Sequence, residues 1–173
     1  ARAAKLPMME PSDSQESKDM FKAAFEISES FDTPVLFRMT TRVCHSKSIV
    51  ECGERTETAI KQYVKNENKY VCVPAIAKVL RANLEDRLER LSVYSEQAEW
   101  NFIEDNHSNI GVIASGACYK YAKEVFGNTA SYLKLGFTYP LPKNKISEFC
   151  KLAGTVYVIE ENDPYIEETV RML

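Results

Sequence analysis

The final third of the chain constrains the fold most, because short β-prone runs alternate there with helical segments. Residues 110–114 form an apolar run, and residues 116–125 follow it with helical patterning. Residues 132–137 form a second run, residues 146–150 a short helical segment, and residues 156–160 a third run. This order predicts an α/β fold with a small three-stranded parallel sheet, right-handed crossovers and helices on both faces.

A last helix is predicted to begin at Pro164, since proline is favoured in the first helical turn. The acidic residues Glu160, Glu161 and Asp163 stand just before it. Carboxylates at this position cap a helix and complement its dipole. Paired carboxylates can also transfer protons, but capping is a sufficient explanation.

The first part of the chain is predicted to be a helix followed by a strand. Asp13 is a candidate N-cap with Glu16 three residues on, and an apolar stripe at helical spacing follows. Residues 35–41 are short, β-prone and preceded by Pro34, which predicts a strand. One helix and one strand are half of a parallel α/β unit, so this piece looks incomplete.

The middle of the chain is predicted to be a connector. Residues 44–68 are polar and mixed, and residues 70–74 are short and extended, stopped by a proline. Residues 75–104 carry the longest helical pattern. The heptad spacing holds for only about three repeats, which favours a helix packed on a domain over a coiled coil.

Composition excludes several classes of protein. The 173 residues are 45% hydrophobic and 27% charged with a net charge of −3, which argues against disorder and against nucleic acid as a partner. No apolar run approaches the roughly 20 residues that span a bilayer, and no signal peptide is visible. The five cysteines form no C-x-x-C pair, which indicates free thiols in a reducing, cytoplasmic setting and no metal site.

Two stretches are candidate binding sites. Thr40, Thr41 and Arg42 end the predicted strand, and ligands of open α/β sheets gather at the carboxyl ends of strands. Alternation along this strand puts Arg38, Thr40 and Arg42 on one face. The alternative is a surface arginine at a domain edge. Ser115 and Gly116 lie between a strand and a helix, where backbone N–H groups suit an anion. The alternative there is a tight turn that needs glycine for close packing.

Other features carry less chemistry. There is no G-x-G-x-x-G or G-x-x-x-x-G-K motif for a nucleotide. Cys44 and His45 are adjacent, so in an extended backbone they point to opposite sides and do not form a nucleophile–base pair. His107 lies in a polar loop and is expected to be solvated.

Six stretches in a fixed order resemble one family. They are residues 10–16 (EPSDSQE), 33–46 (TPVLFRMTTRVCHS), 70–75 (YVCVPA), 111–116 (GVIASG), 133–142 (LKLGFTYPLP) and 156–168 (VYVIEENDPYIEE). Together they resemble the alpha (large) subunit of indolepyruvate:ferredoxin oxidoreductase. That family belongs with the thiamine-diphosphate-dependent 2-oxoacid:ferredoxin oxidoreductases.

The resemblance implies an activity for a parent protein. Such enzymes oxidatively decarboxylate an aryl 2-oxoacid such as indolepyruvate to an acyl-CoA, with ferredoxin as the electron acceptor. Thiamine diphosphate, magnesium and 4Fe-4S clusters are the implied cofactors of the parent. A beta subunit, ferredoxin, coenzyme A and the 2-oxoacid are its implied partners. Thr40, Thr41, Arg42 and His45 are then expected to face the active-site region.

The resemblance also implies that this chain is an internal fragment. Residues 1–47 resemble the end of a pyrimidine-binding domain, residues 48–104 a connector, and residues 105–173 a transketolase C-terminal-like domain. The cofactor-activating glutamate, the G-D-G motif and the ferredoxin cysteines have no counterpart here, and the chain opens without methionine. We therefore expect a structural and interface module that binds no cofactor by itself. Its N-terminal part is expected to expose the apolar side chains of Met20, Phe21, Phe25 and Val35, which the missing strands would cover. The alternative is a free-standing, non-catalytic α/β module that binds a protein or an anion.

Overall fold

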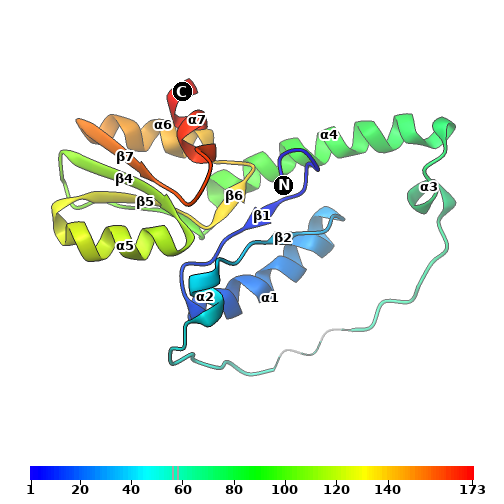
Figure 1. The fold of residues 1–173 in the computed structure, drawn as a ribbon. Helices are drawn as coiled ribbons and strands as arrows, with labels where there is room; N and C mark the ends of the chain where they lie inside the picture. The colour runs from blue at the N-terminus through cyan, green and yellow to red at the C-terminus, as the bar shows by residue number, and fades with distance from the viewer. Residues whose placement is uncertain (56, 58) are drawn as a thin grey trace.

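The structure of the chain is a computed structural model that describes residues 1–55, 57 and 59–173 (Figure 1). The elements in chain order are β1 (Met8–Met9), α1 (Ser14–Phe31), β2 (Leu36–Phe37), α2 (Thr41–His45), α3 (Glu67–Tyr70), α4 (Pro74–Gln97), β3 (Asn101–Glu104), β4 (Ile110–Ser115), α5 (Gly116–Phe126), the 3₁₀ turn η1 (Gly127–Thr129), β5 (Ser131–Leu135), β6 (Phe137–Tyr139), α6 (Lys143–Leu152), β7 (Thr155–Ile159) and α7 (Tyr165–Met172). The described strands form two sheets, in the orders β2-β1-β6 and β3-β5-β4-β7.

The larger sheet confirms the predicted α/β class. β4 lies at its centre and pairs in parallel with β5 and with β7. Helix α5 covers one face, and α6 and α7 cover the other (Figure 1). Ile113 on β4 is fully buried beneath α6, whereas its neighbours Val112 and Ala114 pack towards α5. The three parallel strands and the helical layers on both faces are therefore as predicted.

A fourth strand takes the place of the end of the predicted long helix. Helix α4 ends at Gln97, and residues 101–104 form β3, which pairs antiparallel with β5. The prediction of helix through residue 104 is wrong there because β5 offers an open edge. Pairing with that edge satisfies the backbone of β3 and lets Ile103 pack on the core.

The predicted strand over residues 132–137 is in fact two strands. Strand β5 ends before Gly136, and β6, which begins after it, belongs to the other sheet. A Cβ at Gly136 would lie 2.9 Å from the carbonyl oxygen of Trp100, so this crossing needs glycine. The side-chain oxygen of buried Asn101 accepts hydrogen bonds from the backbone N–H groups of Gly136 (3.0 Å) and Phe137 (2.9 Å). Asn101 thereby stabilises the backbone between β5 of one sheet and β6 of the other.

The smaller sheet corrects the predicted strand over residues 35–41. Only Leu36 and Phe37 are strand, paired in parallel with β1, which the sequence did not indicate. Thr40 is the extended N-cap of α2, so Thr41 and Arg42 are helical. The alternation that placed Arg38, Thr40 and Arg42 on one strand face therefore does not apply. Two-residue strands are too short to leave a period-2 pattern.

Helix α1 packs against both the smaller sheet and the C-terminal half of α4. The Asp13 side chain accepts a hydrogen bond from the backbone N–H of Glu16, which confirms the predicted N-cap. Met20 is fully buried with Phe137 and Leu91, so the expectation that it would be exposed is wrong. Phe21 and Phe25 on the adjoining face of α1 are exposed, as expected.

The connector between α2 and α4 begins beside the first turns of α1 and reaches the end of α1 again at α3 (Figure 1). Polar contacts join the two: Lys18 donates to the carbonyl oxygen of Glu51 (2.6 Å), and Lys69 pairs with Asp32 (2.5 Å). Tyr70 ends the short helix α3, so the predicted extended piece is confined to residues 71–73. Within the described residues, no helix is long and apolar enough to cross a membrane.

Candidate functional site

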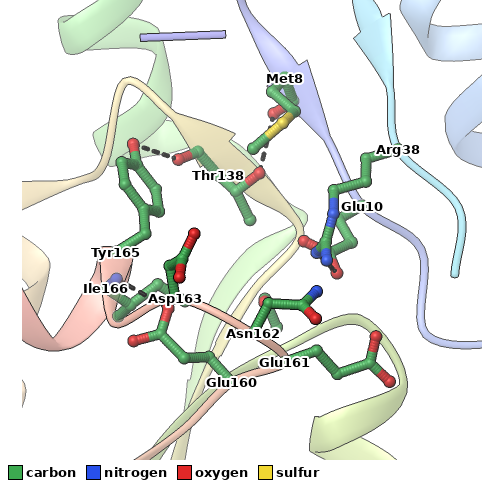
Figure 2. A pocket seen from close by; sticks show the side chains of 11 residues that line it. Met8, Glu10, Arg38, Thr138, Glu160, Glu161, Asn162, Asp163, Tyr165 and Ile166 are labelled. Carbon is green, nitrogen blue, oxygen red and sulfur yellow. Dashed lines mark hydrogen bonds and ion pairs between the residues drawn. The ribbon is translucent and has the colours of Figure 1, made fainter.

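One hollow borders the larger sheet where the connections between its strands change direction. β4 leads to α5 on one face, whereas β7 leads to α7 on the other (Figure 1). The hollow lies at the carboxyl ends of these two strands. We call this cavity of about 290 Å³ the switch-point crevice. It is lined by Met8, Glu10, Arg38, Ser115, Thr138, Glu160, Glu161, Asn162, Asp163, Tyr165 and Ile166 (Figure 2).

A buried ion pair from the smaller sheet forms one wall of the switch-point crevice. Glu10 follows β1, Arg38 follows β2, and the Arg38 guanidinium pairs with the Glu10 carboxylate (Figure 2). The Glu10 side chain is only 5% exposed. Burial raises the pKa of Glu10 above its ordinary value, although Arg38 and a hydrogen bond with Ser115 act against the rise. Parallel pairing of β1 with β2 brings the two side chains together.

Ser115 and Gly116, the predicted anion-binding turn, face this carboxylate. Ser115 is the buried N-cap of α5, and Gly116 has a φ of +50°. A Cβ on Gly116 would lie 2.6 Å from Oε1 of Glu10. The N-terminal end of α5 therefore already has a carboxylate of the same chain against it, which is electrostatically favourable. The alternative interpretation, a turn that needs glycine for close packing, describes this geometry.

One residue of the acidic cluster after β7, Glu160, acts as a helix cap. The two carboxylate oxygens of Glu160 accept hydrogen bonds from the backbone N–H groups of Ile166 (2.8 Å) and Glu167 (3.0 Å) at the start of α7. This confirms the capping interpretation for Glu160. The Tyr165 hydroxyl donates to the carbonyl oxygen of Thr138 (3.0 Å), and burial raises the pKa of Tyr165. The polar atoms of Glu160 and Tyr165 are therefore used in hydrogen bonds to the backbone that forms the crevice wall.

The other predicted site residues border a second hollow, which we call the α2 hollow. It is lined by Ser12, Asp13, Ser14, Thr41, Arg42, Val43, His45, Ser46, Ser48, Ala117, Lys120 and Tyr121. Thr41, Arg42 and His45 thus lie together, apart from Ser115. Thr40 is buried, and its hydroxyl has no hydrogen-bond partner among the described residues.

The donor groups of the described residues do not fit a metal ion or an iron–sulfur cluster. No group of three or more His, Cys, Asp or Glu side chains in the described ranges is arranged to hold a metal. The five cysteines are free thiols. Cys44 and His45 lie on helix α2, not on an extended strand, and no hydrogen bond joins them in this part of the chain. His107 is exposed in its loop, as predicted.

Sequence reasoning missed Glu10, Arg38 and Lys120 as lining residues. Glu10 opens the first of the six stretches that carry the family resemblance, which was the available signal. Arg38 was noted only for its place on a strand face. Lys120 sits on the polar side of α5, where nothing in the sequence separates it from an ordinary surface lysine.

The fold has a counterpart among solved oxidoreductases that act on 2-oxoacids. A 2-oxoglutarate:ferredoxin oxidoreductase from Magnetococcus marinus superposes with a TM-score of 0.63 over 96% of this chain and 37% of that chain. At 11% identity this similarity concerns the fold alone. No family model matches the chain.

The similarity in sequence to curated proteins is higher than the similarity to this solved structure. The chain is 40% identical over 98% of its length to the indolepyruvate oxidoreductase subunit IorA of Methanothermobacter marburgensis. It is 36% identical over 99% of its length to the subunit of the same name from Archaeoglobus fulgidus. The resemblance found in the six stretches is confirmed, and the chain is similar to one part of this subunit. It spans only 28% of the length of these relatives.

Proposed function

We propose that this chain is an internal part of the large subunit of an oxidoreductase that oxidatively decarboxylates aryl 2-oxoacids. Indolepyruvate is the expected substrate, an acyl-CoA the product and ferredoxin the electron acceptor. The observation that carries the proposal is the 40% identity to an indolepyruvate oxidoreductase subunit along 98% of the chain. The fold shared with a 2-oxoacid:ferredoxin oxidoreductase supports it.

In this proposal the chain is a structural and interface module. Residues 1–47 are the end of a pyrimidine-binding domain, residues 48–104 the connector, and residues 105–173 a transketolase C-terminal-like domain. In the described part of the chain the outer edge of β2 is unpaired, which supports the first assignment, since an open edge accepts a further strand. Exposed Phe21 and Phe25 beside that edge support it too.

The cofactors of the proposed enzyme belong to other parts of the parent protein. Thiamine diphosphate would supply the electron sink for decarboxylation, and 4Fe-4S clusters would supply electron transfer. The described residues offer neither clustered cysteines nor a magnesium-binding set of carboxylates. A beta subunit, ferredoxin and coenzyme A are the proposed partners, and the cytoplasm is the proposed location.

The proposed activity is tested with the complete subunit and its partner subunit. Purified together, they are expected to reduce ferredoxin in the presence of indolepyruvate, coenzyme A and thiamine diphosphate. The 173-residue chain alone is expected to show no turnover. Absence of 2-oxoacid-dependent reduction by the complete protein would contradict the proposal and favour a non-catalytic binding module.

We further propose that Thr40, Thr41, Arg42 and His45 face the active-site region of the parent. Arg42→Ala in the complete enzyme is expected to lower kcat/KM for indolepyruvate by about tenfold or more, the loss of one charge-assisted contact. Arg81→Ala on exposed α4 removes the same charge elsewhere and is the control. Unchanged turnover in Arg42→Ala would remove this role.

A further inference from the structure

The N-terminal part of α4 projects beyond both sheets, with the short helix α3 near its start (Figure 1). The buried residues of α4 are Leu91 and Ser95, so none of the residues before Leu91 is buried. The positions that repeat every seven residues along one face of the helix are Ala77, Leu84 and Leu91 in one row and Leu80, Arg87 and Tyr94 in the other. The face that enters the core at Leu91 therefore continues onto a part of the helix that the described residues cover only in part.

A hollow of about 520 Å³ lies between this part of α4 and α3, and we call it the α4 groove. Its wall includes Tyr70 of α3 and Val79, Leu80, Leu84 and Arg87 of α4. Val79 is 59% exposed and Tyr70 is exposed as well, whereas Leu80 and Leu84 are half-buried. Exposed apolar side chains grouped with a tyrosine and an arginine are typical of a surface that binds another polypeptide.

Arg87 supplies an unsatisfied donor in the wall of the α4 groove. Its Nε atom is buried but has no hydrogen-bond partner among the described residues. The carboxylate of Asp32, which also lines the groove, pairs with Lys69 (2.5 Å). On α4 itself, the carboxylate of Asp86 pairs with Arg90 (3.0 Å). A buried donor without an acceptor costs free energy, so this position favours a carboxylate that comes from outside the groove.

The charges of the α4 groove argue against a second copy of this chain as its occupant. The carboxylate of Asp32 in the groove wall is already paired, so a copy that docked through the same groove would bring no free carboxylate to Arg87. The chain spans only 28% of the length of its curated relatives, so most of their length lies outside the part that it matches. A segment joined to the same polypeptide also has a high effective concentration at the groove.

From this geometry we infer that the α4 groove is a docking site for another part of the same large subunit. The docked segment has an apolar side that covers Val79, Leu80 and Leu84, and a carboxylate that pairs with Arg87. This inference rests on the proposed function, because that proposal makes the chain one part of a longer subunit.

The inference is tested by hydrogen exchange of the backbone amides of residues 74–88, measured by mass spectrometry. In the complete large subunit these amides are expected to exchange at least about tenfold more slowly than in the 173-residue chain, because a docked segment opposes local opening of the helix. The complete subunit is measured both alone and with its beta subunit, and the 173-residue chain is measured over a range of concentrations.

Two valines on α4 connect the protection to the groove. Val79 lines the groove and is 59% exposed, whereas Val93 is 58% exposed and does not line it. In the complete subunit, Val79→Ser is expected to speed the exchange of residues 74–88 by at least about threefold, because buried apolar contact is lost. Val93→Ser is the control and is expected to change it by less than about twofold. In the 173-residue chain the two variants are expected to behave alike.

A second pair of variants tests the carboxylate. Arg87→Gln in the complete subunit is expected to speed the exchange of residues 74–88 by at least about threefold, since a charge-assisted hydrogen bond is lost. Arg90→Gln is the control, because Arg90 already pairs with Asp86 and does not line the groove. Circular dichroism checks that each variant is folded, and the valine pair carries the test if Arg87→Gln is not.

Several results would overturn the inference. The first is equal exchange of residues 74–88 in the complete subunit and in the 173-residue chain. The second is protection that appears only when the beta subunit is added, since the occupant is then a different protein. The third is protection in the 173-residue chain that rises with its concentration, since the occupant is then a second copy. Equal effects of Val79→Ser and Val93→Ser in the complete subunit would also overturn it.

Hydrogen exchange measures docking and not turnover, so its result is independent of the ferredoxin-reduction assay. An active subunit in which residues 74–88 are not protected contradicts this inference alone. An inactive subunit in which they are protected contradicts the proposed activity alone.

Discussion

Lys134 shows how one residue joins the larger sheet to helix α1. It lies on β5, its side chain is 0% exposed, and it pairs with Glu16 in the first turn of α1. The rings of Phe102 and Tyr119 lie 5.6 and 6.0 Å from its ammonium group. Burial lowers the pKa of Lys134, and Glu16 opposes the shift. The pair therefore sets where α1 begins relative to the larger sheet.

Lys134→Met is expected to lower the free energy of unfolding by about 2–4 kcal/mol. The substitution keeps the side-chain volume but leaves the partly buried Glu16 carboxylate without its cation. Urea unfolding measures the change. Arg171→Met, which breaks the exposed pair with Glu167, is the control and is expected to cost less than about 1 kcal/mol. Equal effects of both substitutions would show that Lys134 has no special structural role.

The buried carboxyl group of Glu10 makes the stability of the fold depend on pH. Its pKa is raised above the ordinary 4.5 by burial, so the folded chain holds this proton more tightly than the unfolded chain. The resulting stabilisation is present below pH 4.5 and is lost as the pH rises through the raised folded value. Ionised Glu10 is thus less favourable to the fold than protonated Glu10.

Glu10→Gln removes this titration while keeping the shape of the side chain. The stability of the variant relative to the unsubstituted chain is expected to rise between about pH 4 and pH 7. Urea midpoints of both proteins at several pH values measure the difference. A difference that stays constant, or that falls with rising pH, would contradict the raised pKa of Glu10.

At the scale of elements, the start of α5 depends on its contact with the segment after β1. Gly116 has a positive φ, and Glu10 fills the space where a Cβ would be. The prediction of a turn at Ser115 and Gly116 came from a strand and a helix flanking a glycine. That a carboxylate from residue 10 would lie against it depends on a contact across 106 positions of sequence, which no local pattern encodes.

Gly116→Ala is expected to destabilise the chain by about 1–3 kcal/mol, from the positive φ and from the clash with Glu10. The same substitution in a Glu10→Ala background is expected to cost less, because only the backbone strain remains. Thermal unfolding of the four proteins in this double-mutant cycle gives the coupling. Additive effects would show that Glu10 does not press on Gly116.

At the scale of the whole molecule, the smaller sheet leaves apolar surface uncovered. Phe21 is 52% and Phe25 63% exposed, and Leu36 lies on the open edge strand β2. Adjacent exposed apolar groups beside an unpaired strand edge favour association. The part of the sequence that looked incomplete is also the part whose surface is not closed.

Phe21→Ser together with Phe25→Ser is expected to reduce concentration-dependent association of the 173-residue chain. The cost in unfolding free energy is expected to be about 1 kcal/mol or less per site, since both rings are largely in solvent. Sedimentation velocity over a range of concentrations measures the association. Val125→Ser, at a more exposed site on α5, is the control and is expected to leave association unchanged.

The sequence by itself determined the α/β class, the three parallel strands, the N-cap Asp13 and the resemblance to an oxidoreductase subunit. Each of these is carried by residues close together in the chain, as a period, a cap or an ordered motif. Tertiary structure alone decided the rest. Residues 101–104 form a strand and not a helix, and the strands on either side of Gly136 belong to different sheets. The predicted site residues lie in two separate hollows. These outcomes depend on which distant segment offers an open strand edge or a buried partner, and local propensity does not contain that information.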